Sequence, residues 1–244
     1  MIAPQLSQPT SHTQRLRHIL NWWFGAMTLI GWPSLTWAQA QQAPASEALP
    51  KVLIIGDSIS IGYTAPLKTL LEGKAKVFHN PGNAQHSGFG LKSLESWLGK
   101  ESWDVIHFNH GLHDLKYVDH EGKNTTSKEK GRIQIPLEQY AQNMEAIVLR
   151  LKQTGAHLIF ASTTPFPDRP AGPLREASST KAYNQAAQQI MESHSIPIND
   201  LHGFALPRLG TLQQPNNVHF TPEGSKALAQ EVARHILKAL GKQP

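Results

Sequence analysis

The chain has 244 residues, no cysteine and a formal net charge of +5. Its length suits one α/β domain, and the lack of cysteine excludes disulfides, a cysteine nucleophile, thiolate metal sites and a lipid-anchored N-terminus. No run of Lys and Arg alternates with aromatic residues, so we expect no nucleic-acid partner.

The first forty residues have the order of a secretory signal. Arg15 and Arg17 precede the apolar stretch 19–37, and Ala38-Gln39-Ala40 follows it. This pattern predicts a signal peptide over residues 1–40, cleaved after Ala40, and a periplasmic or secreted protein. A retained membrane anchor is the alternative, and it would be the chain's only membrane contact.

Residues 41–50 are rich in Ala and Pro and predict a linker before a domain over 51–244. In that domain, short apolar runs alternate with patterns of helical period. Strands are predicted at 51–55, 76–79, 103–109, 156–163 and 196–200. Helices are predicted at 58–71, 91–98, 137–155 and 181–194, and a last helix is capped by Thr221 with Pro222 at its first position.

This alternation predicts an α/β fold, a three-layer α/β/α sandwich around a mainly parallel five-stranded sheet. In such sheets ligands bind at the carboxyl ends of the strands, so the loops that follow strands carry the functional information. Segment 116–132 is polar and charged. We expect a solvated loop there, with a substrate-facing flap as the alternative.

Four short motifs stand at expected strand ends or helix starts. They are GDS at 56–58, NPGNAQHSGFG at 80–90, NHGLHD at 109–114 and NNVHFTPEG at 216–224. Together they resemble the blocks of the SGNH, or GDSL-type, hydrolase superfamily, over nearly all of 51–240. A Gly-Asp-Ser alone occurs by chance in many proteins, whereas its pairing with the last motif is specific. The resemblance implies a flavodoxin-like sheet and a serine esterase.

Ser58 and His219 are the candidate nucleophile and base. A serine hydroxyl is a weak nucleophile that needs a base within hydrogen-bond reach, and an imidazole can take its proton and return it to the leaving group. The backbone N–H of Ser58 can also face a developing oxyanion. The alternatives are a helix cap for Ser58 and a packing role for His219.

The resemblance also implies oxyanion donors from a backbone glycine and an asparagine side chain. Gly82 or Asn83 supplies the first donor, with the register open. His113 stands at the asparagine position, and a neutral imidazole can still donate one N–H. Polar side chains beside these positions are expected to support the site: Asp57, Asn109 and Asp114.

Asn216 occupies the position where the superfamily has an aspartate, three residues before the histidine. An amide can orient His219 but cannot stabilise an imidazolium by charge. Three alternatives remain: a Ser–His dyad oriented by a backbone carbonyl, a carboxylate from elsewhere, or a weakened, carbohydrate-binding homologue.

Four histidines cluster in one region: His107, His110, His113 and His120. His110 and His113 have a metal-ligand spacing for a helix, but Gly111 and the preceding strand argue against helical geometry. His107 is expected to be buried in its strand. We therefore expect no metal and no cofactor.

The resemblance implies an ester substrate. The polar strand-end loops favour an acylated, in particular acetylated, carbohydrate, and a lysophospholipid or short-chain acyl ester is the alternative. Aromatic platforms for a sugar would come from Phe89, Trp97, Tyr117 or Phe166.

Overall fold

The computed structural model describes residues 48–168 and 170–243. The expected signal peptide and most of the expected linker lie outside the described residues. Within the described part of the chain, no helix is both long and apolar enough to span a membrane.

A five-stranded sheet forms the centre of the domain, and every pair of neighbouring strands in it is parallel. The strand order is β2-β1-β3-β6-β7, which confirms the predicted parallel sheet. The central strands are apolar and buried, as expected for a sheet covered on both faces. The strands are β1 (Lys51–Ile55), β2 (Lys76–His79), β3 (Val105–Phe108), β6 (His157–Ala161) and β7 (Ile198–Asn199).

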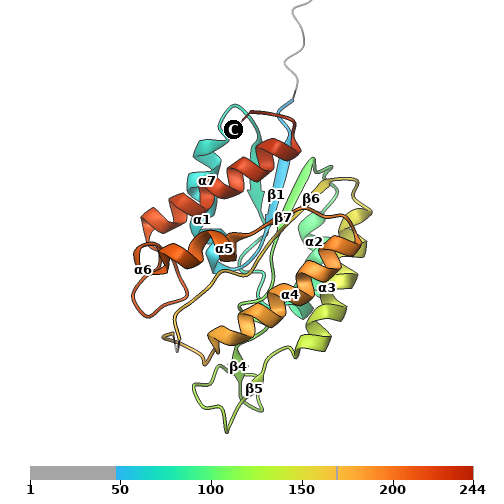
Figure 1. The fold of residues 1–244 in the computed structure, drawn as a ribbon. Helices are drawn as coiled ribbons and strands as arrows, with labels where there is room; N and C mark the ends of the chain where they lie inside the picture. The colour runs from blue at the N-terminus through green and yellow to red at the C-terminus, as the bar shows by residue number, and fades with distance from the viewer. Residues whose placement is uncertain (1–47, 169, 244) are drawn as a thin grey trace, which may run out of the picture. The chain divides into compact units, whose positions relative to one another are not determined.

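Helices cover both faces of this sheet. Figure 1 shows α1 (Ser58–Leu70) and α7 (Pro222–Ala239) on one side, and α2 (Ser87–Leu98), α3 (Leu137–Lys152) and α4 (Ala177–Ser193) on the other. The predicted three-layer α/β/α sandwich is therefore confirmed. Three short elements between β7 and α7 were not expected: α5 (Leu201–Ala205), the 3₁₀ helix η1 (Leu206–Arg208) and α6 (Leu209–Leu212).

Two helices begin earlier than the sequence predicts. The first of them, α2, starts at Ser87 rather than 91, because His86 caps it by accepting a hydrogen bond from the Phe89 N–H at 3.2 Å. Gly88 and Gly90 lie in its first turn and weaken the helical signal there. The second, α4, starts four residues before the expected position.

The charged insertion 116–132 is partly ordered against its neighbours. It contains β4 (Tyr117–Val118) and the first residue of β5 (Arg132–Ile133), which pair antiparallel. The Tyr117 N–H donates to Leu174 O at 2.9 Å, and the Leu174 N–H donates to Thr125 O at 2.8 Å. These backbone hydrogen bonds hold the insertion against the segment that follows β6. A wholly solvated loop would not make them.

The order of the strands places the site. The chain leaves β1 for β2 on one side and returns to β3 on the other, so the connections diverge at the carboxyl ends of β1 and β3. In doubly wound sheets this switch point is where ligands bind. Ser58 follows β1 and the segment 109–114 follows β3, so the fold brings these two motifs to one place.

Candidate active site

The turn after β1 presents Ser58. A side chain at Gly56 would put its Cβ 2.8 Å from Ser60 Oγ, so this tight turn requires glycine. Asp57 is the residue that caps α1, since its Oδ1 accepts the Ile59 N–H at 2.9 Å. Ser58 is the first helical residue, and its hydroxyl is free to meet a partner across the sheet edge.

That partner is His219. Ser58 Oγ and His219 Nε2 are 2.8 Å apart, although 161 residues separate them in the chain. The position of His219 is fixed by the start of α7, where the Thr221 hydroxyl accepts the Gly224 N–H at 3.0 Å. The carbonyl of His219 also accepts the Gln214 N–H at 2.9 Å. At this distance the imidazole can accept the serine proton.

The residue that orients His219 is Asn217 and not the expected Asn216. His219 Nδ1 and Asn217 Oδ1 are 2.8 Å apart, and the same oxygen accepts the His219 N–H at 3.1 Å. Asn216 is exposed, with a left-handed φ of 50°, and its carbonyl accepts the Ala171 N–H. This local turn directs the second amide, rather than the first, toward the ring.

The expected oxyanion donors are only partly brought to the pair. His113 and Asn83 line the same pocket as Ser58 and His219, but Gly82 does not. Gly82 lies in an exposed left-handed turn with φ 64°. Desolvation, and then the neighbouring cations, lower the pKa of His113 to about 3. The ring is therefore neutral at ordinary pH and has one N–H to donate.

The three expected supporting residues hold the framework. Asn109 donates to Ala161 O at 2.7 Å and so joins the ends of β3 and β6. Asp57 caps α1, and burial raises the pKa of its carboxyl. Asp114 Oδ1 accepts the Ser87 N–H at 2.8 Å and the Ser87 hydroxyl at 2.5 Å, which ties the third motif to the start of α2.

The pocket over the pair has a volume of about 520 Å³, a size typical of small-molecule sites. Its wall includes Lys116 and Asn124 from the insertion and Arg175 from the segment after β6. This geometry favours the alternative of a substrate-facing insertion. None of the expected aromatic platforms is among the described residues that line the pocket, and Trp97, Tyr117 and Phe166 are buried.

Asp114 makes a testable contribution to stability. It is fully buried, and burial raises the pKa of its carboxyl from 3.8 to about 7. The folded state therefore binds this proton more tightly than the unfolded state. The resulting stability is complete below pH 3.8 and is lost as the pH rises through about 7. Between about pH 5 and pH 8 the free energy of unfolding should fall by about 3 kcal/mol for this reason.

Asp114→Asn is expected to remove this pH dependence. Urea unfolding at both pH values should show the wild-type free energy of unfolding falling more steeply than that of the variant. Glu138→Gln, at an exposed position on α3, is the control and should follow the wild type. Parallel profiles for wild type and Asp114→Asn would contradict the prediction.

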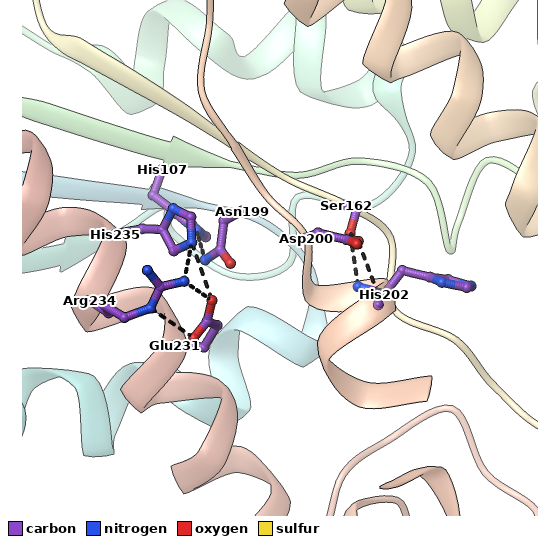
Figure 2. A network of polar contacts seen from close by, with 9 residues as sticks. His107, Ser162, Asn199, Asp200, His202, Glu231, Arg234 and His235 are labelled. Carbon is purple, nitrogen blue, oxygen red and sulfur yellow. Dashed lines mark hydrogen bonds and ion pairs between the residues drawn. The ribbon is translucent and has the colours of Figure 1, made fainter. Parts of the chain in front are cut away.

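The other clustered histidines do not form a metal site. Among the described residues, no group of three His, Asp or Glu side chains could hold a metal ion. His110 is buried against the Gln85 carbonyl, and burial lowers its pKa to about 4. His107 is buried in β3, as expected, and Figure 2 shows it beside Asn199, with the two side-chain nitrogens 3.2 Å apart.

Figure 2 also shows a second grouping of serine, aspartate and histidine, near β7. The Ser162 hydroxyl donates to Asp200 Oδ1 at 2.8 Å and accepts the backbone N–H of His202 at 2.8 Å. The His202 ring points away from both side chains. This grouping therefore lacks the serine–imidazole contact that a nucleophile needs.

A parallel three-layer fold that presents these four motifs at its switch point is the architecture of the SGNH hydrolases. The GDSL-like lipase/acylhydrolase family matches residues 54–227, and the chain belongs to this family. It is a carboxylic ester hydrolase, as the motifs predict.

Solved structures share the fold at low sequence identity. A lipase/acylhydrolase from Enterococcus faecalis is 20% identical, with a TM-score of 0.63 over 80% of this chain and 98% of its own. The acetyl xylan esterase AlAXEase is 12% identical, with a TM-score of 0.62 over 76% and 99%. The psychrotrophic esterase EstA from Pseudoalteromonas sp. is 18% identical, with a TM-score of 0.59 over 79% and 99%. No curated protein matches the chain in sequence.

Proposed function

We propose that the protein is an exported serine esterase that removes acetyl groups from carbohydrate, with Ser58 as nucleophile and His219 as base. The observation that carries the catalytic part is the 2.8 Å contact between Ser58 Oγ and His219 Nε2 inside a pocket of about 520 Å³. Membership of an acylhydrolase family and a likeness in fold to an acetyl xylan esterase support the substrate class.

The proposed reaction has two halves. Ser58 Oγ attacks the acyl carbonyl carbon while its proton passes to His219 Nε2, and the carbonyl oxygen becomes an oxyanion. His219 then returns the proton to the sugar oxygen as the ester bond breaks, which leaves an acetyl group on Ser58. A water molecule then attacks the acyl carbon while His219 takes its proton. The bond between the acyl carbon and Ser58 Oγ breaks, His219 returns the proton to Ser58 Oγ, and acetate leaves.

His113 and the Ser58 N–H are the proposed oxyanion donors. His113→Asn keeps an N–H donor and is expected to hold kcat within a few-fold of wild type. His113→Phe removes the donor and should lower kcat about a hundredfold, as for other oxyanion-hole donors. Steady-state kinetics on an aryl acetate distinguishes the two variants. An equal loss in both would show that the ring, and not its N–H, is what the site requires.

Acyl-length preference tests the substrate class. The purified chain is assayed on aryl acetate, butyrate and octanoate esters. Turnover that falls with chain length supports the deacetylase, because polar side chains, among them Lys116, Asn124 and Arg175, line the pocket beside the pair. A preference for octanoate would favour a lipid or acyl-ester substrate instead. Acetate release from acetylated xylan, measured beside these esters, extends the test to carbohydrate.

Export is the remaining part of the proposal. It is supported by the order of Arg15, Arg17, the apolar stretch 19–37 and Ala38-Gln39-Ala40. N-terminal sequencing of the protein from the exported fraction should start at Gln41. A chain that retains Met1 and stays with the membrane would favour an anchor instead.

A further inference from the structure

The catalytic pocket contains two cationic side chains that no described carboxylate neutralises by contact. Lys116 and Arg175 line the pocket with Ser58 and His219. Neither takes part in an ion pair among the described residues. Asp57 is the one acidic side chain among the described residues of the lining. The wall beside the nucleophile is therefore positively charged.

Arg175 is buried and hydrogen-bonded at this wall. The residue is only 6% exposed, and its Nε donates to Leu112 O at 2.9 Å. Leu112 directly precedes His113, so the guanidinium is attached to the segment that carries the proposed oxyanion donor. Burying a guanidinium is costly unless an anion or several acceptors compensate it. The charge of Asp57 favours the Arg175 cation without forming an ion pair with it, and a ligand anion in the pocket would add the direct contact that is lacking.

Lys116 adds a second charge at the same place. It is half-buried, and desolvation together with the charge of Arg175 lowers the pKa of its amine. The two cations line the same pocket and repel each other there, while the carboxyl of Asp114 favours the charged form of Lys116. An anion bound between them would relieve this repulsion, and the planar guanidinium fork suits a carboxylate.

We propose that Arg175 and Lys116 form a carboxylate-binding subsite, so that the substrate is an O-acetyl ester of an acidic, uronate-type sugar. This inference rests on the proposed function and narrows its substrate. An esterified acetyl group carries no free carboxylate, so the carboxylate that binds this subsite belongs to the sugar. The planar guanidinium fork of Arg175 suits a carboxylate, and phosphate is the other anion that the binding test below must exclude.

The kinetic test compares two esters that differ in one charge. These are an O-acetylated methyl galacturonoside and its C6 amide, which has the same shape without the charge. We expect the wild-type chain to hydrolyse the carboxylate form with a KM at least tenfold lower, as for one charge-assisted hydrogen bond. Equal KM values would overturn the subsite.

Variants then assign the preference to residues. Lys116→Gln and Arg175→Gln should each reduce the ratio of kcat/KM between the two esters about tenfold. Lys130→Gln makes the same charge change at an exposed position outside the pocket wall and should keep the wild-type ratio. An equal loss in Lys130→Gln would assign the preference to overall charge and overturn the proposal. Because Arg175 is buried, Lys116→Gln keeps the test valid if Arg175→Gln fails to fold.

Binding separates this inference from the proposed function. Calorimetry on the Ser58→Ala chain measures galacturonate, galacturonamide and galactose 6-phosphate without any turnover. Tighter binding of galacturonate supports the subsite even if no ester is hydrolysed. Tighter binding of the phosphate overturns the assignment to a carboxylate. A wild-type chain that hydrolyses both esters equally retains the proposed function and loses the subsite.

A wild-type preference for 4-nitrophenyl hemisuccinate over 4-nitrophenyl butyrate would place the carboxylate on the acyl group and overturn the sugar assignment.

Discussion

Ser58→Ala is expected to abolish ester hydrolysis, with a fall in kcat of about five to six orders of magnitude. The reason is that Ser58 Oγ is the atom that forms the acyl-enzyme, and its contact with His219 Nε2 at 2.8 Å is the route for its proton. His219→Ala should lose nearly as much. The double variant should be no worse than either single one, because nucleophile and base act as a unit.

Two measurements check this result. Steady-state turnover of an aryl acetate gives the loss in kcat, and covalent labelling by a fluorophosphonate shows whether an activated serine remains. Ser162→Ala is the matched control, since Ser162 belongs to the other grouping of serine, aspartate and histidine but does not contact an imidazole. Labelling that is lost in Ser162→Ala and kept in Ser58→Ala would show that the nucleophile is Ser162, after β6, and not Ser58.

The parallel sheet was predictable because its strands are short apolar runs buried on both faces. That signal depends only on local composition, so β1 and β3 were found within a few residues of their ends. The short helices α5 and α6 carry no comparable signal. Four or five residues cannot show a helical period, and isolated helices of this length are unstable without tertiary packing.

The site residues that belong to a sequence motif could be predicted. A residue whose orientation depends on the folded conformation of a loop could not. Ser58 is the first residue of α1 and His219 lies two residues before the cap of α7, and the structure brings them together. The choice between Asn216 and Asn217 depends on the left-handed turn at Asn216. The sequence contains two adjacent amides, but the residues around them do not determine which one contacts the imidazole.

Lys116 and Arg175 were not identified from the sequence for a related reason. Both lie in segments without regular periodicity, 59 residues apart. They line the same pocket because the insertion pairs with the chain after β6. A single basic residue in a polar loop is ordinarily a solvated one. The signal that distinguishes these two is burial beside a nucleophile, which requires the three-dimensional arrangement.

Asn217→Asp is expected to raise kcat about a hundredfold. Asn217 Oδ1 already holds the proton on His219 Nδ1, which leaves Nε2 free to accept from Ser58. The amide therefore supplies the tautomer but no charge. A carboxylate at the same position would stabilise the imidazolium that forms in the transition state. In serine proteases, replacing the triad aspartate by asparagine lowers kcat by about four orders of magnitude, because the imidazole then adopts the wrong tautomer. The gain here should be smaller, because Asn217 already holds the right tautomer.

Asn216→Asp is the matched comparison for this prediction. It adds the same charge one residue earlier, on an exposed side chain that does not contact the ring, and solvent screens such a charge. Its kcat should stay within about twofold of wild type. Asn217→Leu should lower kcat, because it removes the group that orients the ring. A large gain from Asn216→Asp and none from Asn217→Asp would show that the first amide faces His219 in the working enzyme. It would also show that this loop adopts the superfamily's register during turnover.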